Sequence, residues 1–391
     1  MEKNVQNALK KLSENAMFKM SLGSKELFHS NFLEFLWNLD EQKFIAVINQ
    51  LADTENFFEK NDGTEYFLSR EKENFDLCIY HEEKYSKSGK EYINPRTKYD
   101  LIIENKVKSI PDKKQLDDYK KKSGGQAKYI LLSLVENFED KKAIEKEWKI
   151  VHYGGLSNAI REKYGESNIY IKDYCDFIKF MHSLQEEIVP NGFNQQSLWA
   201  DYDEYKSYRL HDLYIKLRGL KFMDLLKEKL VEKGITFEAV KKAGTELRKL
   251  ARETPDNKKP DVYINWNVFN AEGQVAVFVY RDKQEIYEIV IQGNHYKHGI
   301  NYANEINNEI TPLDKDKKES RSKIWEKVNN YEFMNDLNYP NKNNKEYCGY
   351  DTDCVYRYYK IDEMEWGKSI DSLLIHMVED VEKLINALDK K

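Results

Sequence analysis

Two charged residues at the end of an apolar segment could act together. Glu104 and Lys106 stand two residues apart in KYDLIIENKV (98–107), and positions i and i+2 of a β-strand face the same side. Charged residues are so frequent here that roughly nine acid-x-Lys triplets are expected by chance. The apolar surroundings make a functional role for this pair more credible, because a charge beside a buried strand is costly unless it is paired or metal-bound. The alternative is a solvated pair just beyond the buried part.

A third charged residue, Asp76, begins the preceding apolar segment FDLCIY (75–80). If the two segments pair as a hairpin, Asp76 lies beside Glu104. Two carboxylates and a nearby backbone carbonyl form a hard-oxygen site suited to Mg²⁺ or Mn²⁺. Such an ion lowers the pKa of bound water and neutralises phosphate charge. Lys106 would orient that water and stabilise developing negative charge.

Asp100 competes with Asp76 for the role of second acid. It shares the strand of Glu104, but four residues along a strand correspond to about 13 Å. That separation is too large for one metal ion, so we favour Asp76. Considered without Glu104, Asp76 could equally be a solvent-exposed acid at the start of a strand.

Periodicity predicts the elements that must position these residues. Short apolar runs bounded by Gly and Pro predict strands, and apolar residues at helical spacing predict helices. The resulting order predicts a mixed sheet flanked by helices, an α/β architecture. The expected helices cover residues 2–20, about 24–39, 43–60, 111–123, 155–164 and 170–188, and the expected strands cover 75–80, 98–107, 127–135 and 148–153.

The segment VPNGFNQQS (189–197) contains Pro and Gly without a periodic pattern, which predicts a domain boundary. We therefore expect domains at 1–188 and 198–391. The second is predicted to be α+β, and its position suggests a specificity or dimerisation role. Its helices are expected over 198–233 and 369–388 and its strands over 235–240, 261–269, 274–280 and 285–293, with a polar stretch at about 303–347.

Composition restricts the class of protein. The 391 residues include 27 Tyr and 18 Phe, enough aromatic residues to build a core. The four cysteines form no CxxC pair, so no zinc site is expected, and scattered thiols suit a reducing cytosol. No apolar run has the length of a signal peptide or a membrane span, which predicts a cytoplasmic protein without a membrane partner.

The net charge of −6 excludes a uniformly basic surface, so any nucleic-acid site must be a local patch. Residues 84–122 contain 12 basic and 6 acidic residues. Residues 206–259 contain 15 basic and 8 acidic residues, interleaved with Tyr208, Tyr214 and Phe222. For this second stretch we favour a solvated helical face over a nucleic-acid contact.

The order and spacing of these motifs resemble the PD-(D/E)XK nuclease superfamily. DLCIY is followed, 28 residues after Asp76, by Glu104 in IIENK, and Phe75 replaces the Pro of the motif. Nine residues after Lys106 comes Gln115, with Tyr119 four residues later. This pair resembles the Q-x-x-x-Y element of the RecB-like and phage-exonuclease-like branch, where both residues stand beside the metal and touch the DNA backbone.

An upstream helix extends the resemblance to about residues 20–185. ELFHSNFLEFLWNL resembles the first helix of PD-(D/E)XK families, in which a Glu contributes to the metal site. The resemblance assigns that role to Glu26, with His29 beside it. Glu34 is a weaker candidate because it lies within the apolar run.

The resemblance implies a restriction-endonuclease-like fold and a Mg²⁺-dependent deoxyribonuclease, with Mn²⁺ as a substitute, acting in defence against foreign DNA or in repair. Its implied metal ligands are Asp76, Glu104 and Glu26, and Lys106 completes the catalytic set. The residues expected to contact substrate are Gln115, Tyr119, Lys113, Lys114 and His29.

Two other functions stay open. The chain could be a non-catalytic module that binds nucleic acid or a partner on a nuclease scaffold, or an effector that a partner activates. The sequence also leaves open RNA as the substrate, endo- or exonucleolytic cleavage, and a homo-oligomeric state.

Overall fold

The computed structural model divides the chain into two compact units, which we describe separately. The first unit is Met1–Ile188 with Asp203–Leu213, and the second is Val189–Tyr202 with Tyr214–Lys391. The residues described are 3–21, 26–54, 56–61, 63–83, 86–87, 90–91, 96–136, 138, 140–240, 247, 249–250, 253–269, 272–280, 285–302 and 354–389. The predicted polar stretch at 303–347 lies outside them.

A five-stranded mixed sheet forms the centre of the first unit, with the order β1-β2-β5-β6-β7. The β1-β2 and β2-β5 pairs are antiparallel, whereas β5-β6 and β6-β7 are parallel. The four predicted strands are present, and β1 is an addition. The strands are β1 (Tyr66–Ser69), β2 (Leu77–Glu83), β5 (Arg96–Lys106), β6 (Lys128–Ser133) and β7 (Lys149–His152), with a separate short pair β3 (Ser86–Lys87) and β4 (Lys90–Glu91).

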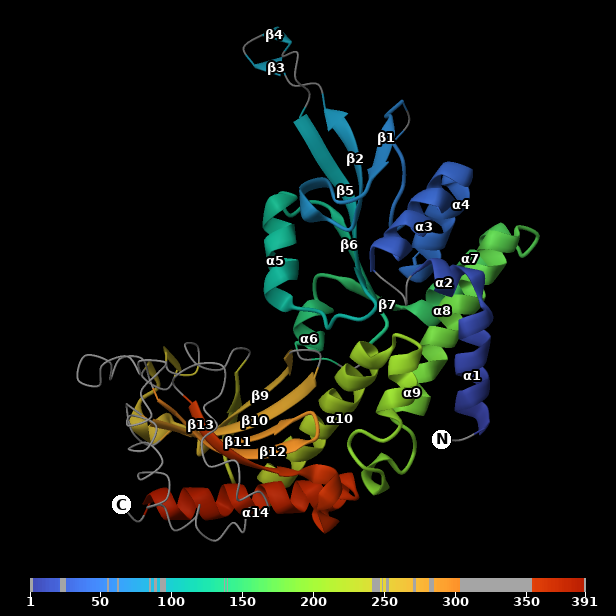
Figure 1. The fold of residues 1–391 in the computed structure, drawn as a ribbon. Coiled ribbons are helices and arrows are strands. Elements are labelled where there is room, and N and C mark those ends of the chain that lie inside the picture. Colours follow the sequence, from blue (N-terminus) through green and yellow to red (C-terminus); the bar gives the residue numbers. More distant parts are fainter. Residues whose placement is uncertain are drawn as a thin grey trace, which may run out of the picture. The chain divides into compact units, whose positions relative to one another are not determined.

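Helices cover both faces of this sheet, which confirms the α/β class (Figure 1). On one face α5 (Lys113–Lys122) connects β5 to the parallel strand β6, as a crossover helix must. Leu116 and Tyr119 of α5 pack there with Phe75 and Cys78. The short α6 (Lys141–Ile144) follows β6; the other face is covered by α3 (Glu26–Leu39), α4 (Glu41–Leu51), α7 (Tyr153–Tyr164) and α8 (Ile169–Ile188).

Two predicted helices of the first unit were wrong in extent. Residues 2–20 form α1 (Lys3–Glu14) and α2 (Ala16–Met20), because the Asn15 side chain accepts a hydrogen bond from the Phe18 N–H and starts a new helix. The helix predicted over 43–60 ends at Leu51 as α4. Beyond it, the Asn49 side chain bonds both the N–H and the C=O of Phe58, which folds the following segment back.

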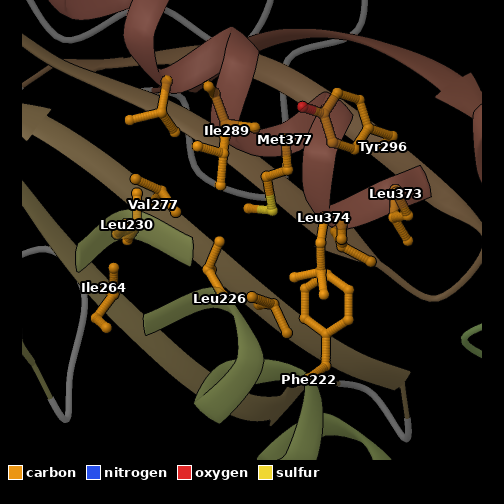
Figure 2. Close-up of a cluster of buried hydrophobic side chains, with 14 of the residues drawn as sticks. Phe222, Leu226, Leu230, Ile264, Val277, Ile289, Tyr296, Leu373, Leu374 and Met377 are labelled. Carbon is orange, nitrogen blue, oxygen red and sulfur yellow. The ribbon is translucent and has the colours of Figure 1, made fainter. Parts of the chain in front are cut away.

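The second unit contains a six-stranded sheet with the order β13-β12-β11-β10-β9-β8, antiparallel except for the β8-β9 pair. Leu226 of α10 and Leu374 of α14 pack against one face, in the core drawn in Figure 2. Strands β12 and β13 were not predicted. The elements are α10 (His211–Glu232), β8 (Phe237–Ala239), β9 (Val262–Phe269), β10 (Glu272–Tyr280), β11 (Glu285–Gln292), β12 (His295–Tyr302), β13 (Cys354–Lys360) and α14 (Ile370–Asp389). Residues 203–213, which include most of α9 (Tyr202–Ser207) and the start of α10, belong to the first unit.

Of the three aromatic residues named for the second basic stretch, residues 206–259, Tyr208 is half-buried. Tyr214 and Phe222 are buried. Arg218 is also buried and donates hydrogen bonds to the backbone carbonyls of Leu198 and Ser197. These residues serve the packing of the second unit. Within the described part of the chain, no helix has the length and apolarity needed to cross a bilayer.

Candidate active site

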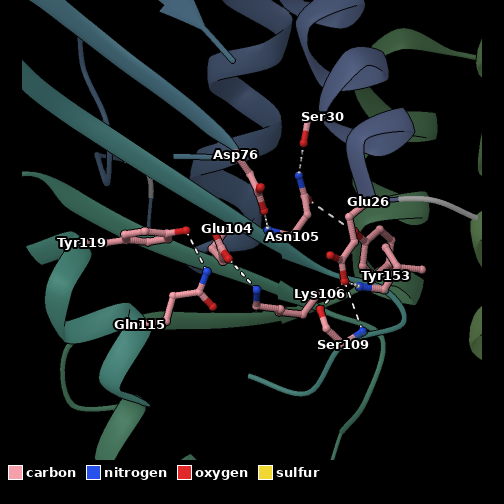
Figure 3. A network of polar contacts seen from close by, with 11 residues as sticks. Glu26, Ser30, Asp76, Glu104, Asn105, Lys106, Ser109, Gln115, Tyr119 and Tyr153 are labelled. Atoms are coloured by element: carbon pink, nitrogen blue, oxygen red, sulfur yellow. Dashed lines mark hydrogen bonds and ion pairs between the residues drawn. The ribbon is translucent and has the colours of Figure 1, made fainter. Parts of the chain in front are cut away.

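The antiparallel pairing of β2 and β5 brings the predicted acids together. Leu77 is opposite Ile103, so Asp76, just before β2, and Glu104, one residue further along β5, come into proximity (Figure 3). The two carboxylates interact directly. Asp76 is partly exposed, whereas the Glu104 side chain has a relative exposure of only 1%.

Lys106 lies on the same side of β5 as Glu104 and forms an ion pair with it. The distance from Lys106 Nζ to Glu104 Oε1 is 2.6 Å, and both side chains are buried. Burial alone would lower the pKa of Lys106, but the charge of Glu104 raises it above its ordinary value. Lys106 is therefore a cation at neutral pH, held among carboxylates.

One positive charge does not balance two adjacent acids. Burial, and next the charge of Asp76, raise the pKa of Glu104 to about 8 in spite of Lys106. Burial also raises the pKa of Asp76, although the Asn105 N–H and Lys106 act in the opposite direction. Such raised carboxyl pKa values are typical of sites in which like charges are held together.

The donor chemistry of this pair fits a hard divalent cation. Glu104 Oε2 is buried and accepts no hydrogen bond within the described structure. A buried carboxylate oxygen without a donor is costly, and a cation beside Asp76 and Glu104 would compensate it. Mg²⁺ commonly binds through one or two carboxylates and completes its shell with water and substrate phosphates. Among the described residues, no group of three or more His, Cys, Asp or Glu side chains is placed to hold a metal ion.

Glu26, the third acid predicted, is engaged with the turn that follows β5. Its Oε1 accepts hydrogen bonds from the backbone N–H groups of Val107 at 3.2 Å and Ser109 at 3.1 Å, and from the Ser109 hydroxyl. Its charge also acts on Lys106 and Asp76. Glu26 thus anchors the end of β5 to the start of α3. Glu34, the weaker candidate, forms an ion pair with Arg70 instead.

The Gln115 and Tyr119 side chains meet on α5 beside the carboxylates (Figure 3). Gln115 Nε2 donates a hydrogen bond to the Tyr119 hydroxyl at 2.8 Å. Burial, and next the charge of Glu104, raise the pKa of Tyr119. The Tyr119 ring packs edge-on against Phe75, the residue before Asp76. The helical i, i+4 spacing therefore brings both side chains to the site.

The other expected substrate contacts lie in different surroundings. Lys113 forms an ion pair with Asp117 at 2.7 Å, and Lys114 is exposed on the same helix. His29 is buried in the core, where its Nδ1 lies 3.1 Å from the Tyr174 hydroxyl. Burial lowers the pKa of His29 to about 3. In the structure His29 is a neutral core residue, and a direct substrate contact does not suit its position.

The competing acid, Asp100, is also paired elsewhere. Its Oδ2 lies 2.6 Å from Nδ1 of His81, at the point where the β2-β5 register shifts between Ile79 and Tyr80. Burial raises the pKa of Asp100, and the hydrogen bond from His81 opposes this rise. Asp100 therefore belongs to a second polar pair.

Sequence reasoning missed three residues behind the carboxylates: Ser30, Asn105 and Tyr153. The Asn105 side chain donates to Ser30 Oγ at 2.7 Å and accepts from the Tyr153 hydroxyl at 3.3 Å. The sequence contained one signal for Asn105. It is a polar residue on the face of β5 opposite Glu104, and Leu101 and Ile103 on that face are both buried.

Comparisons with known proteins found no matching family model, curated protein or solved structure. The resemblance to PD-(D/E)XK nucleases therefore rests on the motifs themselves.

Proposed function

We propose that this protein is a Mg²⁺-dependent nuclease of the PD-(D/E)XK type, with a restriction-endonuclease-like first unit. The observation that carries the proposal is the buried Glu104 carboxylate. It lies against Asp76 and Lys106, and one of its oxygens has no donor within the described structure. This is an arrangement that a divalent cation would complete.

Asp76 and Glu104 would hold the cation, and Glu26 would support the site through the 107–109 turn and its negative charge. When bound, Mg²⁺ would supply an activated water and neutralise charge on the scissile phosphate. Lys106, fixed at 2.6 Å from Glu104, would orient the attacking water. Gln115 and Tyr119 would contact the substrate backbone.

We propose DNA as the substrate and defence against foreign DNA or repair as the setting. The basic residues of 84–122 support a nucleic-acid partner, because Lys and Arg contribute most of the affinity for phosphates. Lys114 is exposed on the helix that carries Gln115 and Tyr119.

The test is cleavage of linear, circular and single-stranded DNA, and of RNA, with Mg²⁺ or Mn²⁺. The variants are Glu104→Gln and Lys106→Ala. We expect either change to lower the rate by about 100- to 1000-fold. The matched control is Glu83→Gln, which neutralises an exposed carboxylate on β2, 3.0 Å from Lys98 Nζ, outside residues 84–122 and should cleave like the wild type.

Each other outcome has a definite meaning. Cleavage that survives both substitutions would show that the site lies elsewhere. Salt-sensitive DNA binding without cleavage would support the non-catalytic module or the partner-activated effector. Circular DNA separates endonuclease from exonuclease action, and the RNA arm identifies the nucleic acid.

A further inference from the structure

Asn105 stands between Glu104 and Lys106 but faces the opposite side of β5. It is fully buried, with 0% exposure. Its amide bridges two helices: Nδ2 donates to Ser30 of α3 at 2.7 Å, and Oδ1 accepts from Tyr153, the first residue of α7, at 3.3 Å (Figure 3). Both ends of the amide thus have partners, as a buried polar group requires.

The backbone of the same residue contacts the candidate metal site. The Asn105 N–H donates to Asp76 Oδ2 at 2.7 Å. Asp76 precedes β2, so this hydrogen bond links it across to the end of β5. The position of Asp76 relative to Glu104 therefore depends on how the backbone is held at Asn105.

We propose that Asn105 is a positioning residue for the two carboxylates. Its side chain fixes the end of β5 between α3 and α7, and its N–H orients Asp76 toward Glu104. This role rests on the proposed function, because it matters only if Asp76 and Glu104 share a cation. Groups behind metal ligands commonly change metal affinity by about 10- to 100-fold when they are removed.

An amide suits this position because it donates to one partner and accepts from the other. Aspartate has a similar shape but, when ionised, cannot donate to Ser30. Leucine has a similar volume but leaves both Ser30 and Tyr153 without their partner. The two replacements therefore test the amide chemistry separately from the space that it fills.

The first readout is Mn²⁺ binding by isothermal titration calorimetry, without nucleic acid. We expect Asn105→Leu and Asn105→Asp to weaken binding by about 10- to 100-fold. Ser30→Ala should weaken it less, and Tyr153→Phe least, because the Tyr153 hydrogen bond is the longer one. These two variants keep Asn105 in place, so they decide the question if the Asn105 variants do not fold.

The matched control is Asn265→Leu in the second unit. Asn265 has 2% exposure and donates from Nδ2 to the Val240 carbonyl at 2.6 Å. Its replacement removes a buried amide of the same type outside the first unit. We expect lower thermal stability with Mn²⁺ affinity unchanged.

The second readout is cleavage as a function of Mn²⁺ concentration. If Asn105 only positions the ligands, saturating Mn²⁺ should restore cleavage by Asn105→Leu, with the KM for DNA unchanged. Glu104→Gln, which alters a ligand, should not recover. A purely structural loss of folded protein would lower the rate at every Mn²⁺ concentration.

The outcomes separate this inference from the proposed function. If the wild type binds Mn²⁺ and cleaves DNA, and all four variants bind Mn²⁺ as it does, the positioning role is overturned and the nuclease stands. If cleavage falls while Mn²⁺ affinity is unchanged, the role is again overturned. If the wild type neither binds Mn²⁺ nor cleaves, the proposed function itself fails.

Discussion

Glu104 in the first unit and Asp380 in the second are both buried carboxylates, but their surroundings are opposite. Asp380 has four polar neighbours among the described residues: the Tyr296 hydroxyl donates to Oδ2 at 3.0 Å, His298 Nε2 and His376 Nε2 lie 3.0 and 3.4 Å from Oδ2, and Lys383 Nζ lies 3.4 Å from Oδ1. Glu104 has one partner, Lys106, and a second acid beside it. Burial alone would raise the pKa of Asp380, but His298, and then His376 and Tyr296, lower it.

This difference separates a structural carboxylate from a candidate functional one. A carboxylate surrounded by donors contributes to stability, because its charge is compensated in the folded protein. A carboxylate held against another acid raises the free energy of the folded state, unless a ligand compensates it. Proteins keep such locally unfavourable arrangements mainly at functional sites.

Neutralising each carboxylate should therefore change stability in opposite directions. Asp380→Asn breaks a buried network, and we expect it to destabilise the second unit by about 3 kcal/mol. Glu104→Gln removes the free-energy cost of keeping Glu104 protonated beside Asp76, and should leave the first unit as stable as before, or more stable. Urea denaturation at pH 7 measures both changes. Equal destabilisation by the two substitutions would contradict the comparison.

Divalent cations should stabilise the first unit only. A ligand that binds the folded state stabilises it by about 2.7 kcal/mol at a concentration 100 times its Kd. We expect Mn²⁺ to raise the first unit's melting temperature and EDTA to reverse the rise. Glu104→Gln should abolish the effect, whereas Asp380→Asn should keep it. A rise that persists in Glu104→Gln would place the ion elsewhere.

The contributions of Glu104 and Asp380 to stability should also change with pH in opposite directions. The pKa of Glu104 is raised from 4.5 to about 8 in the folded protein, so its ionisation destabilises the fold as pH rises through that window. The advantage of Glu104→Gln over the wild type should grow by about 3.5 kcal/mol between pH 5 and 8.

The pKa of Asp380 is lowered below 3.8, so its contribution is present above pH 3.8 and is lost as pH falls through its folded value. Burial lowers the pKa of His376 below 6.5, so acid should destabilise the second unit through this residue as well. Denaturation curves for wild type, Glu104→Gln and Asp380→Asn at several pH values test both signs. A Glu104→Gln advantage that is constant with pH would contradict the raised pKa.

Much of the first unit could be predicted because its strands are continuous apolar runs. The second sheet was only partly predictable. Strand β12 buries Tyr296 and His298, and these polar aromatic residues give no apolar alternation. The break in the N-terminal helix depends on one side chain, Asn15, which periodicity does not detect.

At the candidate site, too, the residues that could be predicted are those whose role follows from local sequence spacing. Glu104 and Lys106 could be identified because two residues along a strand fix their common face. Asn105 could not, since its partners Ser30 and Tyr153 are 75 and 48 residues away in sequence. His29 is adjacent to Ser30 on α3, but only packing decides that it is a core residue.

The smallest expected effect concerns the segment that leads into Asp76. Glu71, Glu73 and Asn74 all have positive φ angles, of 55°, 54° and 68°. This conformation costs an L-residue roughly 1 kcal/mol. Glu71→Gly would relieve that cost but also lose about 0.5 to 1 kcal/mol through the greater freedom of the unfolded chain. The net change in stability should therefore be under about 0.5 kcal/mol.

The informative readout for Glu71→Gly is Mn²⁺ affinity rather than stability. If this segment orients Asp76, its greater freedom should weaken Mn²⁺ binding, though less than Asn105→Leu does. The control is Asp53→Gly, at another exposed residue with a φ of 54°, just beyond the end of α4. Both variants should have similar stability, and only Glu71→Gly should bind Mn²⁺ more weakly. Equal affinities would mean that Asp76 is held from the β5 side alone, through the Asn105 N–H.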